Sequence, residues 1–113
     1  MFLAELVRAA TSGGFVMVSF WQFMDSPDLA SAAKASHAQA SAQLGLSPDA
    51  FDEGDYLLSW QNQAGAVRYC HHFTDEEIDD LVASLGNMAQ VKARFKSDGR
   101  TGMLNTYLVL QVR

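Results

Sequence analysis

The sequence has a single cysteine, Cys70, and only two prolines among its 113 residues. One cysteine excludes an intramolecular disulfide, and a chain without disulfides is typical of a reducing compartment. A chain of this length can bury a core without disulfides or a metal ion. We therefore expect one cytoplasmic domain over residues 1–113, made of an N-terminal helix (1–12) and an α/β core (15–112).

Basic residues are also scarce, with eight Lys and Arg against thirteen Asp and Glu and a net charge of −5. Binding to phosphates needs clustered Lys and Arg, which this composition does not supply. No apolar run approaches the length that spans a bilayer, and the N-terminus lacks the basic residues of a signal peptide. We therefore expect neither nucleic acid nor a membrane as a direct partner.

Known catalytic motifs are missing: there is no nucleophile elbow, phosphate-binding loop, HExxH zinc motif or GxGxxG turn. Cys70, His71 and His72 are residue types that bind metals or act as nucleophile and base. Side chains alternate between the faces of a strand, so only Cys70 and His72 share a face, and a metal needs at least one more ligand there. The sequence predicts no catalytic residue, no metal and no cofactor.

The strongest local signal lies at residues 66–85, AVRYCHHFTDEEIDDLVASL, which indicates a strand that leads directly into a helix. Thr74 and Glu77 have the spacing of a capping box, and Phe73 and Ile78 have that of a hydrophobic staple. The segment resembles the strand-to-helix segment near the C-terminus of class V aminotransferases and cysteine desulfurases. Those enzymes need a large domain with a Schiff-base lysine, for which this chain has no space, so the resemblance transfers no residue role.

Turn and periodicity signals predict the other elements. Residues 15–23 form a strand that is apolar on both faces, which is typical of a strand covered on both sides. Ser26 and Pro27 begin a helix that ends near Gly45. Further strands are expected at 55–61, 66–73 and 103–112, with a turn at 62–65 and a helix from Asp75 that continues, through a break at Gly86, to about Phe95.

This order, β-α-β-β-α-β after the first helix, predicts an α+β fold of the ferredoxin-like (split βαβ) type. Such a fold has one antiparallel sheet of four strands with two helices on one face. The strand at 15–23 is apolar on both faces, so the face of the sheet opposite the two helices must also be covered. The N-terminal helix or a second copy of the chain could supply it, and we favour the second copy, which predicts a homodimer or larger homo-oligomer.

The first functional hypothesis is a small acidic, non-enzymatic module that acts by binding another protein or by self-association. Acidic side chains on the helix after Thr74 could dock on a basic surface, or imitate a row of phosphates and so inhibit or regulate nucleic-acid-binding machinery. The candidate surface residues are Asp75, Glu76, Asp79 and Asp80.

The alternative is a small-molecule-binding protein or cofactor-independent enzyme of the dimeric α+β-barrel kind. Its pocket would lie between sheet and helices and would be lined by aromatic residues. The candidate lining residues are Met17, Trp21, Phe23, His37, Trp60, Cys70 and His72. A cavity with convergent polar groups favours this alternative, whereas a solid core with an exposed patch favours the interaction module.

Overall fold

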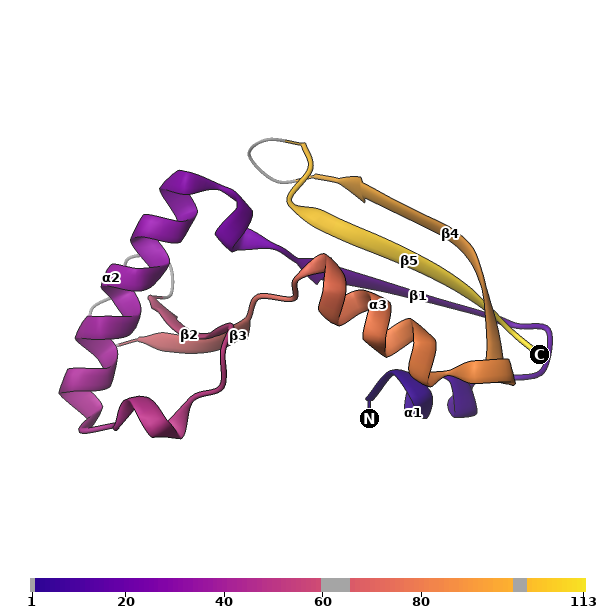
Figure 1. The fold of residues 1–113 in the computed structure, drawn as a ribbon, viewed down its shortest axis with the longest axis horizontal. Coiled ribbons are helices and arrows are strands. Elements are labelled where there is room, and N and C mark those ends of the chain that lie inside the picture. Colours follow the sequence, from indigo (N-terminus) through magenta and orange to yellow (C-terminus); the bar gives the residue numbers. More distant parts are fainter. Residues whose placement is uncertain (1, 60–65, 99–101) are drawn as a thin grey trace. The chain divides into compact units, whose positions relative to one another are not determined.

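The computed structural model describes residues 2–59, 66–98 and 102–113, and the chain divides into two compact units. The first, here called the sheet unit, comprises Met1–Gln22 and Phe73–Arg113. The second, here called the hairpin unit, comprises Phe23–His72. Figure 1 follows the chain through both. The expectation that residues 1–113 form a single domain stays a prediction.

The sheet unit holds three antiparallel strands in the order β1-β5-β4. A short 3₁₀ turn joins its second helix to β4. Its elements are α1 (Phe2–Ala9), β1 (Phe15–Trp21), α3 (Asp75–Ser84), β4 (Ala89–Ser97) and β5 (Asn105–Val112).

One face of this sheet is covered by α1 and α3 together (Figure 1). Phe20 of β1 and Leu108 of β5 are buried and cluster with Leu3 and Val7 of α1 and with Ile78 of α3. Full burial of such a side chain contributes about 1.5–3 kcal/mol. This cluster is therefore the main hydrophobic core of the sheet unit.

The opposite face of the sheet, here called the open face, carries apolar side chains that stay exposed. Phe15 is 64% exposed, Met17 68% and Phe95 47%. By strand alternation and register, the paired strand residues on this face are uncharged: they are Phe15, Met17, Ser19, Trp21, Gln90, Ala93, Phe95, Ser97, Asn105, Tyr107, Val109 and Gln111. Beside them, the Tyr107 hydroxyl donates to the Asp98 carboxylate. The suggestion that α1 covers the second face was wrong, because α1 packs beside α3 on the first. Self-association stays a prediction.

The hairpin unit combines a long helix with a two-stranded antiparallel sheet. The helix begins and ends where the sequence predicts: the Ser26 hydroxyl accepts the Leu29 N–H, Pro27 follows, and Gly45 ends it in a left-handed conformation (φ 68°). None of the described helices is long and apolar enough to cross a bilayer. The elements of this unit are α2 (Pro27–Leu44), β2 (Asp55–Ser59), β3 (Val67–His71) and two 3₁₀ turns, Phe23–Asp25 and Pro48–Ala50.

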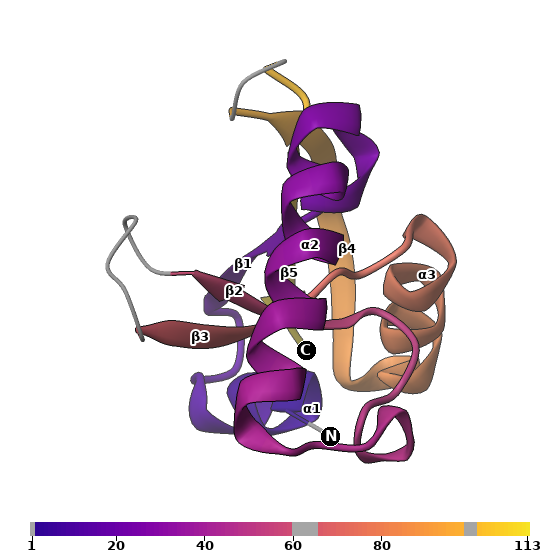
Figure 2. The same cartoon turned by 90° about the vertical axis from the view of Figure 1, so that its left-hand side faces the viewer.

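Side chains of α2 bind the edge of β2, alongside which the helix runs (Figure 2). His37 Nδ1 accepts the Leu57 N–H at 3.1 Å. Ser36 Oγ donates to the Leu57 carbonyl at 3.1 Å and accepts the Ser59 N–H at 2.8 Å. These bonds satisfy backbone groups that an edge strand otherwise leaves open to pairing.

Helix α3 begins at the capping box that the sequence predicts. Thr74 Oγ1 accepts the Glu77 N–H at 3.1 Å, and Glu77 Oε1 accepts the Thr74 N–H at 3.2 Å. Phe73 packs against the cluster that contains Ile78, as a hydrophobic staple requires. Local signals thus fix the entry of the chain into α3.

Replacing Thr74 with alanine should lower the free energy of unfolding by about 1 kcal/mol, because the Glu77 N–H loses its side-chain cap. Chemical denaturation measures the change. Thr74→Ser keeps the hydroxyl and is the matched control, so equal losses in both variants would contradict a capping role.

The structure confirms an α+β fold with antiparallel strands but differs from a ferredoxin-like sheet in two respects. The strands form a three-stranded and a two-stranded sheet, not one sheet of four. Residues 89–97, most of which the sequence analysis placed in a helix, form β4. Met88, Val91 and Phe95 have helical spacing, but charged and apolar residues also alternate over 92–96, which is the period of a strand. The predicted turn at 62–65 lies outside the described residues.

Candidate functional site

A buried glutamine connects three elements of the sheet unit at the carboxyl end of β1. Gln22 is 1% exposed. Its Nε2 donates to the Phe73 carbonyl at 3.0 Å and to Asp75 Oδ1 at 2.8 Å, while its Oε1 accepts the Thr106 hydroxyl at 2.7 Å. All the hydrogen-bonding capacity of the amide except one lone pair is used, so this network fixes the start of α3 against β1 and β5.

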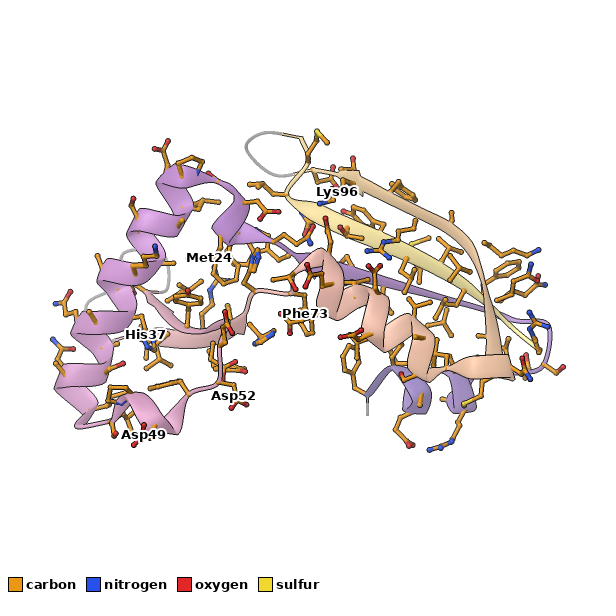
Figure 3. The ribbon with its side chains drawn as sticks, viewed as in Figure 1. Met24, His37, Asp49, Asp52, Phe73 and Lys96 are labelled. Carbon is orange, nitrogen blue, oxygen red and sulfur yellow. The ribbon has the colours of Figure 1, made fainter. Side chains whose placement is uncertain are left out.

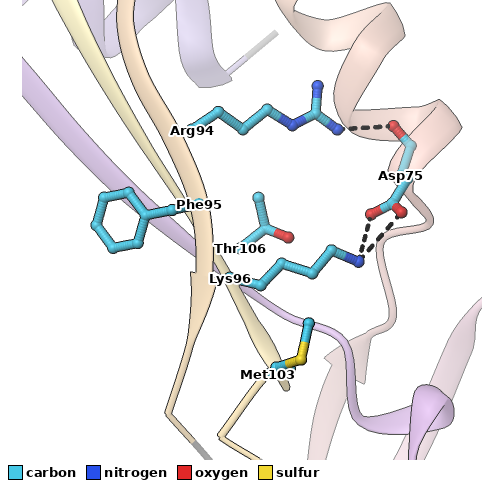
Figure 4. Close-up of a pocket in the computed structure, with 6 residues that line it drawn as sticks. All are labelled: Asp75, Arg94, Phe95, Lys96, Met103 and Thr106. Atoms are coloured by element: carbon cyan, nitrogen blue, oxygen red, sulfur yellow. Dashed lines mark hydrogen bonds and ion pairs between the residues drawn. The ribbon is translucent and has the colours of Figure 1, made fainter.

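Asp75 and Thr106 also line a hollow of about 450 Å³ that opens to the surface (Figure 4). Arg94 and Lys96 reach into it from β4. Lys96 Nζ lies 3.0 and 3.1 Å from the two carboxylate oxygens of Asp75. The Arg94 guanidinium donates to the Asp75 carbonyl at 3.3 Å and pairs with Asp79. The remaining lining residues are Phe95 and Met103.

The hydrogen bond from Gln22 and the ammonium group of Lys96 hold the pKa of Asp75 below its usual value of 3.8. Asp75 is therefore a carboxylate at neutral pH and can accept hydrogen bonds from a ligand. Among the described residues, no three His, Cys, Asp or Glu side chains are placed to hold a metal ion. The hollow is thus suited to binding and orienting a polar molecule.

A second polar cluster lies in the hairpin unit, around Asp55 at the start of β2. Asp55 Oδ1 accepts the Tyr69 hydroxyl at 2.6 Å and lies 2.7 Å from His71 Nδ1. Its Oδ2 accepts the Asp52 N–H at 2.9 Å. A Cβ at Gly54 would lie 2.9 Å from His71 Cε1, so only glycine fits beside the ring.

These contacts shift two ionisation equilibria in opposite directions. Burial alone would raise the pKa of Asp55, but hydrogen bonds from Tyr69 and His71 outweigh it and lower that pKa. The same hydrogen bond to Asp55 raises the pKa of Tyr69 to about 12. Asp55 therefore stays charged and Tyr69 stays neutral over the physiological range.

Spectrophotometric titration should show Tyr69 ionising near pH 12, assigned by its absence in Tyr69→Phe. In Asp55→Asn the pKa of Tyr69 should fall towards the usual value of 10, because the charged acceptor is gone. An unchanged titration in Asp55→Asn would contradict the hydrogen bond as the cause of the shift.

The aromatic pocket predicted from the sequence stays a prediction, and its candidate residues are divided between the two units. Met17 and Trp21 belong to the sheet unit, and the other described candidates belong to the hairpin unit. There Phe23 packs edge-on against His72 at 5.6 Å, and His37 packs against Phe51 at 4.6 Å, pointing from α2 to the hairpin side of the helix (Figure 3). These rings form the core of that unit. Trp60 lies outside the described residues.

The Cys-His-His sequence at the end of β3 divides as strand alternation predicts. His71 contacts Asp55, whereas His72 Nδ1 accepts the Met24 N–H at 3.2 Å. Cys70 is half-buried, and burial raises the pKa of its thiol, which opposes thiolate formation. The three residues therefore do not form one site.

The predicted acidic surface on α3 is partly neutralised. Lys96 pairs with Asp75 and Arg94 pairs with Asp79, while Glu76 and Asp80 are exposed. The sequence analysis named these carboxylates but not their partners. Gln22, Arg94, Lys96 and Thr106 were missed as site residues. The group of basic residues at 92–96 is a signal for Arg94 and Lys96, and nothing in the sequence points to Gln22 or Thr106.

No family model matches the chain, and no curated protein matches it. Among solved structures, a SAM-dependent methyltransferase from Methanosarcina mazei is similar in fold, with a TM-score of 0.59 and 17% sequence identity. The match covers 97% of this chain and 49% of the methyltransferase chain, so this chain spans about half the length of that protein. The prediction of a non-enzymatic interaction module was wrong, because the shared fold is that of an enzyme.

Proposed function

We propose that this chain forms part of a methyltransferase that uses S-adenosylmethionine, and that it supplies the side of the enzyme that binds the methyl acceptor. The observation that carries the proposal is the match of nearly the whole chain to about half of the M. mazei methyltransferase. A match to half of an enzyme favours one part of a catalytic fold over a complete enzyme.

The described residues do not fit the cofactor. Open α/β folds hold nucleotide cofactors on a glycine-rich turn between a strand and a helix N-terminus. Here β1 leads into Gln22 and Phe23, and β3 leads into α3 through residues 72–74, without a glycine in either connection. We therefore assign the cofactor to the half of the methyltransferase fold that this chain does not match.

The hollow at the carboxyl end of β1 is the site we assign to the acceptor. Asp75 can accept a hydrogen bond from an acceptor hydroxyl or amine, and Gln22 holds Asp75 in place from behind. Holding the acceptor at a fixed position is what methyl transfer requires of this side of the enzyme.

The test uses the protein purified from its own cells through a tag added to the native gene, compared with the isolated 113-residue chain. We expect the native protein to bind S-adenosylmethionine in calorimetry and to form S-adenosylhomocysteine when supplied with a cell extract as acceptor source. The isolated chain should bind no cofactor. Absence of cofactor binding by the native protein would refute the proposal, and tight binding by the isolated chain would refute the assignment to the acceptor side.

Asp75→Asn in the native protein probes the hollow. Loss of one charge-assisted hydrogen bond should slow methyl transfer about tenfold, with cofactor binding unchanged. Asp80→Asn, an exposed carboxylate on the same helix, is the matched control. Equal rates in both variants would contradict the role of the hollow.

A further inference from the structure

We infer that the outer edge of β1 pairs with a parallel strand of a second α/β unit, so that β1 is an internal strand of a larger sheet. The inference uses the half-length match to the M. mazei protein but not the activity of that protein. It therefore stands or falls separately from the proposed function.

The pairing of β1 with β5 determines which backbone N–H and carbonyl groups of β1 point to the outer edge. The Gln22 N–H donates to the Leu104 carbonyl at 2.7 Å, and the Gly14 carbonyl accepts the Val112 N–H at 2.8 Å. Because hydrogen-bonded and non-hydrogen-bonded pairs alternate along an antiparallel ladder, the even-numbered residues of β1 pair with β5. The odd-numbered residues Phe15, Met17 and Ser19 turn their N–H and carbonyl groups to the outer edge.

The sequence of β1 itself lacks the features that keep natural edge strands from pairing. The strand reads FVMVSFW, with no charge, no proline and an unbroken register against β5. By contrast, β4 carries Lys92, Arg94, Lys96 and a bulge, and the edge of β2 is bound by side chains of α2. Charges and bulges at an edge discourage the addition of strands. The contrast with β4 and with the α2-bound edge of β2 supports β1 as an internal strand of the native protein.

The open face supports the same conclusion. A strand rich in β-branched and aromatic residues on both faces is typical of parallel strands inside α/β sheets. Phe15 and Met17 remain 64% and 68% exposed, on a face whose paired strand residues are uncharged. A larger sheet with a second layer of helices would bury them, whereas the described residues of the sheet unit place helices on one face only.

A second copy of this chain fits the edge less well than a different unit does. Two copies related by a two-fold axis would meet edge to edge with their β1 strands antiparallel. The near-continuous apolar pattern favours a parallel neighbour, and parallel strands arrive through crossover connections of a separate α/β unit. The unmatched half of the methyltransferase chain is of the size to contain such a unit.

Proline substitutions test the edge directly. Met17→Pro removes an outward N–H and leaves the ladder with β5 intact, whereas Val18→Pro removes an inward N–H. Met17→Pro should leave the melting temperature of the isolated 113-residue chain nearly unchanged but lower that of the protein purified from its own cells, or release the partner polypeptide. Val18→Pro is the control and should destabilise both.

Amide hydrogen exchange gives an independent readout on the unsubstituted protein. The amides of residues 15, 17 and 19 should exchange about 100-fold more slowly in the native protein than in the isolated chain. Equal exchange in both, or a native protein that tolerates Met17→Pro, would overturn the inference. So would an isolated chain that forms a dimer and protects these amides, because a second copy would then occupy the edge.

Discussion

Replacing Leu108 with alanine should lower the free energy of unfolding of the 113-residue chain by about 2–5 kcal/mol. Leu108 is 0% exposed and lies in the middle of the central strand of its sheet, within the cluster that joins α1, α3 and β1. The loss combines the transfer of its apolar atoms with the cavity left between two helices and a sheet, which have little room to collapse. Chemical denaturation followed by circular dichroism measures the change.

The matched control lies on the open face of the same sheet. Met17→Ala removes a comparable apolar volume from a side chain that is 68% exposed, so the expected loss is within about 0.5 kcal/mol. Similar losses at both positions would mean that the open face is buried in the isolated chain, and would contradict the one-sided core.

Gln22→Leu should cost about 2–3 kcal/mol, although leucine is close in size and more apolar. Gln22 satisfies the buried Thr106 hydroxyl and the Phe73 carbonyl and binds the Asp75 carboxylate. The substitution removes the partner of the Thr106 hydroxyl, which stays buried, and that is costlier than losing the bond alone. The double variant Gln22→Leu with Thr106→Val should lose less than the sum of the single variants, because it removes both ends of one bond.

The same substitution should change the pH dependence of stability. The folded-state pKa of Asp75 lies below its ordinary value of 3.8, so its ionised form stabilises the native state above that pH. This contribution is lost as the pH falls through the lowered pKa. The hydrogen bond from Gln22 is the largest cause of the shift, so stability should fall less steeply with acid in Gln22→Leu than in the unsubstituted chain. Parallel slopes would contradict the network.

Local sequence signals predicted the ends of helices well because capping depends on residues close in sequence. Ser26, Gly45 and Thr74 lie at the predicted helix boundaries. The strands were harder to place, since Val91 and Phe95 satisfy a helical period and a strand period at once. Strand pairing depends on contacts distant in sequence, and periodicity contains no information on whether β2 and β3 join the main sheet.

The candidate site was not predictable from spacing for the same reason. Gln22 and Thr106 are separated by 84 positions, and neither belongs to a motif. Asp75 was predicted as part of an acidic interaction surface, and its pairing with Lys96 depends on β4 being a strand. Cys70 and His72 were candidate site residues because of their residue types, but in the fold their contacts serve the packing of the hairpin unit.

The bulge in β4 determines where this strand can change length during evolution. Val91 lies opposite Leu110 and Ala93 opposite Val109, so Lys92 is an extra residue that no partner opposes. Deleting Lys92 would straighten the strand and leave every remaining side chain on its present face. Deleting a residue beyond Ala93 would exchange the faces of all that follow and turn Lys96 away from α3. Homologous chains are therefore expected to vary by one residue at the bulge and to keep a constant length from there to the end of the strand.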